Sequence, residues 1–180
     1  MRRIFIALAA GTVAIAATQT AHAYPRPAHD DLQAVLMTVR VGETIDGAKT
    51  PPQIVITLDR NAVIAALQGK EEAGLLNPVF TAGYINSHKN SLAIVTGLVH
   101  SAMVLDGAYR NSNMDLSHVR VVMVLPNDYG PAQKILLFSF DFDRARYDKI
   151  DWDHFDPANI PKAALNFRYS PWAKMSAEPP

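Results

Sequence analysis

The stretch HVRVVMVLPNDYGPAQKILLFSFDFD, residues 118–143, decides the fold. Two apolar runs, 119–125 and 135–142, flank a segment over 126–131 that is dense in Pro, Asn, Asp and Gly. Apolar runs of this length around a cluster of turn-forming residues are typical of a β-hairpin. The sequence therefore predicts two neighbouring antiparallel strands here.

Alternation along the second run assigns its two faces, because side chains in a strand point alternately to opposite sides of the sheet. We expect the Phe-containing side to face the core and the strand to emerge into solvent near Ser139. In the first run Arg120 is the only charge, which favours a central position in the sheet. The predicted core side is Leu136, Phe138, Phe140 and Phe142, and the predicted opposite side is Ile135, Leu137, Ser139, Asp141 and Asp143.

Two further strands and a helix are predicted on the N-terminal side of this hairpin. Alternation predicts strands over 35–41 and 53–58, joined by a loop over 42–52 that contains two Gly and two Pro. Asp59 is a suitable N-cap for a short helix over 60–68. We expect all of these elements to join the hairpin in one sheet-based domain.

The pattern weakens after this helix. Gly69 is expected to end it, as Gly commonly does at helix C-termini. Within 70–90 the best fits are one helical turn over 71–76, stopped before a Pro, and a short strand over 79–85.

Residues 91–109 have the period of an amphipathic helix, and its second face is small or mildly polar and carries no charge. A solvated face would normally carry Lys, Glu or Arg, so we expect another surface to approach it: a segment of the same chain, a second subunit in a homodimer, or a ligand. Gly97 and the β-branched residues lower helix propensity, so a pair of strands is the alternative. The binding residues predicted on this face are Gly97, His100, Ser101 and Val104.

The segment 141–156 is the candidate for metal chemistry, with six Asp among 16 residues. Asp151, Asp153 and His154 supply the oxygen and imidazole groups that hard or borderline cations bind. However, the spacing misses the calcium-loop pattern, because no Gly stands at the sharp turn and no bidentate Glu follows. We therefore expect a solvated acidic loop without a metal, and a site on these three residues is the alternative.

The last segment, 157–180, contains five Pro, which excludes long regular elements. We expect an irregular strap held over the sheet by apolar side chains. These anchors are Ile160, Leu165, Phe167, Tyr169 and Trp172.

Residues 1–23 have the three zones of a secretory signal: Arg2 and Arg3, an apolar stretch, and a small-x-small site that predicts cleavage after Ala23. The apolar stretch is short for a membrane span, which needs roughly 20 residues. The Arg pair also resembles a twin-arginine core, but such pairs are common in ordinary signals, so we favour the general secretory route. The expected mature protein is a single domain over 24–180 without a membrane span, periplasmic or secreted.

Composition excludes several classes of function. The chain has no Cys, so disulfides, thiolate metal sites and Cys nucleophiles are excluded. Without Arg2 and Arg3 the 17 basic residues become 15 against 17 acidic ones, a net charge of −2. This charge gives no basic field for nucleic acid. A mature chain of 157 residues (180 − 23) must be held by its hydrophobic core, and it is long enough to form one.

Motifs for chemistry are absent from the sequence: there is no phosphate-binding Gly loop, G-x-S-x-G, H-E-x-x-H or dinucleotide fingerprint. The sequence predicts an α+β fold, an antiparallel sheet of about four to five strands with one main amphipathic helix on one face. The expected function is that of an exported binding or accessory protein of the cell envelope, without a cofactor or catalytic activity. Its partner would be a protein or a small molecule. The alternative is a small periplasmic metal-assisted hydrolase that uses the segment 141–156.

Overall fold

The computed structural model of this protein describes residues 32–111, 116–127 and 130–176 of the chain. The predicted signal peptide, 1–23, and the lead-in, 24–31, lie outside the described residues. Five strands form one sheet in the order β1-β2-β3-β4-β5. The strands are β1 (Val41–Asp46), β2 (Gln53–Leu58), β3 (His118–Asn127), β4 (Gly130–Asp143) and β5 (Leu165–Tyr169).

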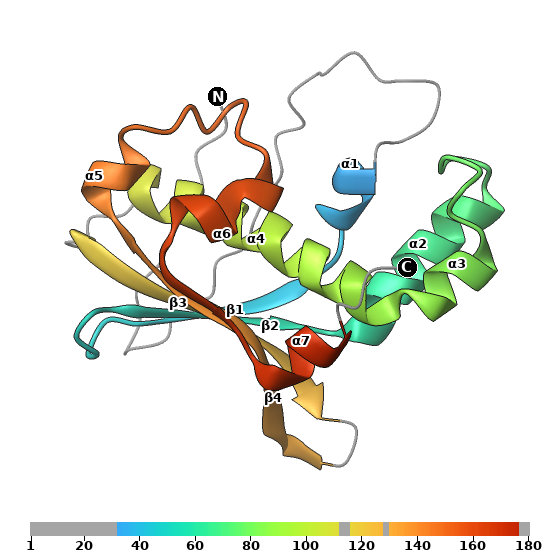
Figure 1. The fold of residues 1–180 in the computed structure, drawn as a ribbon, viewed down its shortest axis with the longest axis horizontal. Helices are drawn as coiled ribbons and strands as arrows, with labels where there is room; N and C mark the ends of the chain where they lie inside the picture. Colours follow the sequence, from blue (N-terminus) through green and yellow to red (C-terminus); the bar gives the residue numbers. More distant parts are fainter. Residues whose placement is uncertain (1–31, 112–115, 128–129, 177–180) are drawn as a thin grey trace.

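One long helix, α4 (Lys89–Asn111), packs across one face of this sheet (Figure 1). The shorter helices gather around it on the same side, since α1, α2, α3, α5, η1 and α7 all contact α4. On the opposite face of the sheet the described residues place no helix. The shorter helices are α1 (Leu32–Leu36), α2 (Arg60–Glu72), α3 (Ala82–Ser87), α5 (Arg144–Tyr147), η1 (Pro157–Asn159), α6 (Ile160–Ala163) and α7 (Pro171–Ser176).

The predicted α+β fold class is confirmed, with one correction to the strand directions. The pairs β1–β2, β3–β4 and β4–β5 are antiparallel, but β2 and β3 run parallel, so the sheet is mixed. The connection between β2 and β3 explains their parallel direction. It runs through α2, α3 and α4, which lie over one face of the sheet. Parallel neighbours require a long crossover of this kind, whereas a short turn suffices for antiparallel ones.

The predicted hairpin is present as β3 and β4, and its Phe side forms the core. Phe138, Phe140 and Phe142 are fully buried or nearly so. The predicted sides of Ile135, Leu136 and Leu137 were wrong. Leu136 is 39% exposed and pairs with Val124 on the open face, whereas Leu137 is fully buried and Ile135 packs against the core. A register shift between Met123 and Val124 adds a residue to β4, so the alternation changes phase at this bulge.

The segment 91–109 is a helix and not a pair of strands, and its uncharged second face lies against the sheet. A Cβ atom on Gly97 would lie 3.1 Å from both Met123 Cγ and Phe138 Cε1. This distance is shorter than an ordinary van der Waals contact, so the small residue lets the helix approach the Phe-lined core. Thr96 is fully buried and its hydroxyl donates to the Leu92 carbonyl at 2.7 Å, which satisfies its polar group.

The predicted strand over 35–41 is wrong, because this segment contains the end of α1 and a turn. Val35 and Leu36 are adjacent and both buried, which a helical turn allows and a strand with one buried face does not. The first strand is β1 instead, which begins at the last residue of the predicted strand, Val41, and continues into the predicted loop. Its polar residues, such as Glu43 and Thr44, conceal the alternation that ends at buried Ile45.

The predictions around α2 hold at its start and fail at its end. Asp59 caps the helix, accepting bonds from the backbone N–H groups of Asn61 and Ala62. The helix continues through Gly69 to Glu72, and Gly74 takes the left-handed conformation, φ +66°, after its end. The short strand predicted over 79–85 is absent, because Thr81 caps α3 there.

The C-terminal segment is more regular than predicted. Ile160 is fully buried, as expected of an anchor, but Leu165–Tyr169 pairs with β4 as the edge strand β5. Apolar residues alternate with polar ones along β5, which is typical of a half-buried strand. The Pro-rich composition conceals this pattern, because all the Pro residues lie outside these five positions.

By length and composition α4 is the one helix among the described residues that could cross a membrane. However, 67% of its most apolar window is buried inside the domain. The core helix of a folded domain passes the same test, and here the sheet and the shorter helices together bury most of α4.

The contact at Gly97 predicts that substituting two helical glycines will have different effects on stability. Gly97→Leu should lower the free energy of unfolding by about 1–3 kcal/mol or more, because the added side chain meets Met123 and Phe138. The matched control is Gly69→Leu in α2, where nothing lies within 4 Å of an added Cβ. There a better helix former should be neutral or raise stability by about 0.5–1 kcal/mol. Urea denaturation of both variants decides this, and equal costs would contradict the packing.

Candidate functional site

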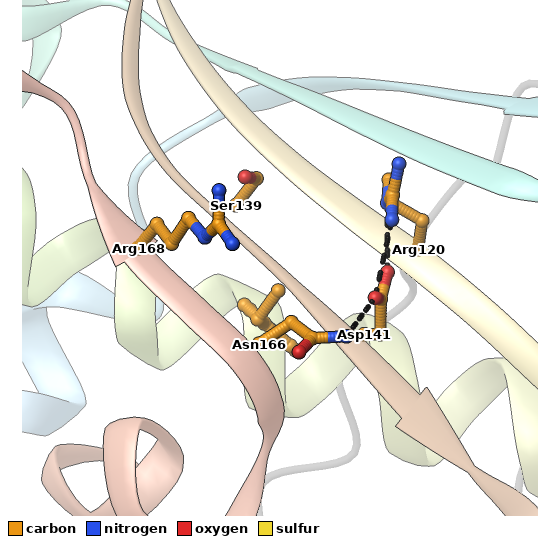
Figure 2. A pocket seen from close by; sticks show the side chains of 6 residues that line it. Arg120, Ser139, Asp141, Asn166 and Arg168 are labelled. Carbon is orange, nitrogen blue, oxygen red and sulfur yellow. Dashed lines mark hydrogen bonds and ion pairs between the residues drawn. The ribbon is translucent and has the colours of Figure 1, made fainter.

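A polar pocket of about 270 Å³ opens on the face of the sheet opposite α4 (Figure 2). Its side chains come from the three strands β3, β4 and β5, near the edge that β5 forms. Rigid strands therefore hold every lining group. The lining residues are Arg120, Ser139, Phe140, Asp141, Asn166 and Arg168.

Strand register brings these residues together. Arg120 on β3 is the cross-strand partner of Asp141 on β4. Ser139, two residues earlier on β4, is the partner of Arg168 on β5. Cross-strand partners have Cβ atoms roughly 5 Å apart, so the two pairs form adjacent rows on one face.

A bidentate ion pair forms one side of the pocket. The Arg120 guanidinium donates to Asp141 through Nε–Oδ1 at 2.7 Å and Nη2–Oδ2 at 3.1 Å. Asn166 Nδ2 donates a third bond to Asp141 Oδ2 at 2.8 Å. Asp141 is 3% exposed, whereas the Arg120 side chain is 50% exposed. The expectation that this acidic side emerges into solvent is thus wrong for Asp141, because the two donors cover it.

These bonds keep Asp141 ionised. The hydrogen bond from Arg120 lowers the pKa of Asp141 most, and burial of the carboxyl opposes part of that effect. The bond from Asn166 and the Arg120 charge lower this pKa further. Asp141 is therefore a fixed carboxylate that orients the two donors.

Asn166 reaches Asp141 from an irregular part of β5. The register passes from Ser139–Arg168 to Asp141–Leu165, so two residues of β5 lie opposite one residue of β4. Asn166 has φ +51°, the left-handed region that Asn adopts more readily than most residues. Bulges are frequent at sheet edges and beside functional sites, where they redirect a side chain. Here the bulge turns the Asn166 amide toward the pocket.

Arg168 and Ser139 form the other side of the pocket. Figure 2 shows the Arg168 guanidinium extending toward Ser139. Within the described part of the chain, neither the guanidinium nor the Ser139 hydroxyl has a hydrogen-bond or ion-pair partner. The pocket holds two guanidinium groups and one carboxylate, a net charge of +1. Its unused groups are thus N–H and O–H donors around a positive charge, which suit an anion.

The predicted binding residues of α4 lie elsewhere, buried between the helix layer and the sheet. Gly97, Ser101 and Val104 are buried, as is His100, whose Nε2 lies 3.1 Å from the Leu36 carbonyl oxygen of α1. Burial lowers the pKa of His100. The surface that approaches Gly97 is the sheet of the same chain, and none of these four residues lines the polar pocket.

The three residues of the alternative metal site are exposed, and they contact different partners. Asp151 Oδ2 lies 2.8 Å from His154 Nδ1, but Asp153 Oδ1 accepts from Arg110 Nη2 at 3.0 Å. Asp143 caps α5. Over residues 32–111, 116–127 and 130–176, no group of three His, Cys, Asp or Glu side chains could hold a metal ion.

A buried acid on β1 went unpredicted. Glu43 pairs with Ile56, so it lies on the sheet face that the helices cover. Its Oε2 atom is buried and has no hydrogen-bond partner, and desolvation by burial raises the pKa of Glu43 from 4.5 to about 7. The sequence signal was the position of Glu43, two residues before Ile45 in a strand where alternate residues face the core.

Of the pocket residues, sequence reasoning singled out Arg120, Ser139 and Asp141 but not their association, and it missed Asn166 and Arg168. The alternation along 165–169 would have placed the last two on the polar face of a strand. No protein-family model, curated protein or solved structure matches this chain significantly.

The ion pair predicts different costs for two Arg→Ala substitutions. Arg120→Ala should lower the free energy of unfolding by about 2 kcal/mol, because it leaves the buried Asp141 carboxylate with Asn166 alone. The half-exposed position of Arg120 keeps this below the cost for a fully buried pair. Arg168→Ala is the matched control and should change stability by less than about 0.5 kcal/mol. Guanidinium chloride denaturation at pH 7 measures both, and equal effects would contradict the pairing.

Glu43 predicts a pH dependence of stability. Because its folded pKa is raised, its contribution to stability is fully present below pH 4.5 and is lost as pH rises to about 7. Glu43→Gln should match wild type near pH 4.5 and exceed it above pH 7 by up to about 3 kcal/mol. His100 titrates in the opposite sense, so the variant must be compared with wild type at each pH. A pH-independent difference in thermal stability would contradict the unpaired burial of Glu43.

Proposed function

We propose that this protein is an exported, non-catalytic binding protein of the cell envelope that holds a small anion in the polar pocket. The observation that carries the proposal is the unpaired Arg168 guanidinium beside the Ser139 hydroxyl, in a pocket that also contains Arg120. Arginine presents planar N–H donors that match carboxylate and phosphate geometry, which favours these two groups as ligands.

The pocket is organised before a ligand arrives. Asp141 holds Arg120 and Asn166 through three hydrogen bonds, so these donors lose little further freedom on binding. Arg120 has five N–H donors, of which the carboxylate uses two, and the others remain for a ligand. Arg168 is the adaptable group, exposed and attached to the edge strand.

The volume favours a small ligand or one polar group of a larger one. At about 270 Å³ the pocket lies below the usual range for drug-sized ligands, roughly 300–1,000 Å³. A carboxylate or phosphate group with a few neighbouring atoms fits this space.

A binding function is favoured over catalysis by the lining residues themselves. Ser139 would need an adjacent base to act as a nucleophile. The lining set contains no His, Lys or Glu, and its one carboxylate, Asp141, already accepts bonds from two donors. The lining groups therefore support recognition of charge and not transfer of a proton.

Export is the part of the proposal that rests on residues 1–23 alone. The basic, apolar and small-x-small zones support cleavage after Ala23. When the full chain is expressed in a bacterial host, the periplasmic fraction should contain a protein that begins at Tyr24. Mass spectrometry of the intact protein measures this, and exported protein that keeps Met1 would contradict it.

The binding proposal predicts that inorganic phosphate and acetate bind the mature protein with millimolar dissociation constants. In NMR titrations the amide signals of Ser139 and Arg168 should move. Arg168→Ala should weaken binding at least tenfold without unfolding the protein, and Arg168→Lys should retain part of it because it keeps the charge. The control is Arg40→Ala, an exposed arginine before β1. No binding to wild type, or equal binding to Arg168→Ala, would refute the proposal.

A further inference from the structure

An apolar strip adjoins the polar pocket on the same open face of the sheet. We define this apolar strip by four side chains on three strands, Val55, Val122, Val124 and Leu136. Leu136 is its exposed member, Val55 and Val122 are half-buried, and Val124 lies beneath them at 7% exposure. Register connects it to the pocket, because Val122 is the cross-strand partner of Ser139 and Val55 is the partner of Val122. The strip therefore begins at the edge of the pocket.

The bulge in β4 completes the strip. The register shift after Met123 places Leu136 opposite Val124, on the open face, and leaves Leu136 39% exposed. Without the extra residue the alternation from Phe138 would put Leu136 in the core. A single exposed leucine is common on protein surfaces, but this one extends an apolar surface that starts beside Ser139.

Polar groups close the strip at its far end. Thr57 is the partner of Val124, and Lys134 Nζ lies 3.5 Å from Thr57 Oγ1. Along β3 the strip thus spans the two positions Val122 and Val124, or roughly 7 Å from one to the other at the usual strand rise. This length suits a short alkyl chain or one ring and not a long acyl chain.

We infer that the ligand of the polar pocket is an amphiphilic organic anion, a carboxylate or phosphate ester with a short apolar group that lies on the apolar strip. This inference rests on the proposed function, since it requires an anion at Arg168. The charged group would contact Arg168 and Ser139, and the apolar group would cover the accessible parts of Val122 and Leu136. Apolar contact adds affinity in proportion to the area removed from water.

Isothermal titration of the mature protein with acetate, hexanoate and inorganic phosphate tests the inference. Hexanoate should bind at least tenfold more tightly than acetate. Leu136→Ser should remove this gain and leave acetate binding unchanged, whereas Arg168→Ala should weaken both. The matched control is Leu75→Ser, because Leu75 is 40% exposed and lies outside the strip. If Leu136→Ser does not fold, Val122→Thr should show the same selective loss at nearly constant volume.

The outcomes separate the two proposals. If acetate binds and hexanoate binds no more tightly than acetate, the inference fails and the proposed function stands. If acetate, hexanoate and inorganic phosphate all fail to bind the wild-type protein, both proposals fail. The inference also fails if sedimentation shows a dimer that Leu136→Ser dissociates, because the strip would then be a subunit interface. Binding to phosphatidylglycerol vesicles without binding to hexanoate would likewise overturn it, since a membrane surface would then be the ligand.

Discussion

The structure depends on one close contact, between the small-residue face of α4 and the Phe-lined face of β3 and β4. Gly97 lies against Met123 and Phe138, so the helix axis approaches the sheet more closely than a larger residue would permit. The chain has no Cys and therefore no disulfide to add stability. Burial against α4 must provide the driving force that holds the sheet, and the other helices gather around α4 on the same side.

This contact also determines where a binding site can lie. Since the helices cover one face of the sheet, the alternate residues of the same strands remain available on the other. Phe138 and Phe140 point into the core, while Ser139 between them and Asp141 after them line the polar pocket. The packing that stabilises the fold therefore also holds the backbone of the pocket in a fixed position.

Sequence reasoning succeeded where one periodicity extends over many residues. The hairpin, β2, the Asp59 cap and α4 all follow from strong alternation, helical period or a capping residue. It failed for β1, where polar residues interrupt the pattern, and for β5, where surrounding prolines concealed a five-residue alternation. Short edge strands give little local signal, because pairing with the neighbouring strand determines their conformation.

The pocket was harder to predict than the fold for a definite physical reason. Arg120 and Asp141 were visible as isolated charges in apolar strands, but their pairing depends on a register that includes a bulge in β4. The association with Asn166 depends on a second bulge, in β5, and on a left-handed residue within it. A change of one residue in either register would reverse the faces, so the site could not be assembled from periodicity.

The ion pair between Arg120 and Asp141 joins two strands at an energetic cost. Burying a carboxylate carries a desolvation cost, and well-packed apolar residues often stabilise a fold as well as or better than a buried ion pair. Here three hydrogen bonds to the Asp141 carboxylate offset that cost and connect β3, β4 and the edge strand β5. An apolar pair at these positions would join the same strands but would orient no donors toward the pocket. The arrangement thus does more than the fold requires, and the additional effect is to hold Arg120 and Asn166 in place beside the unpaired Arg168.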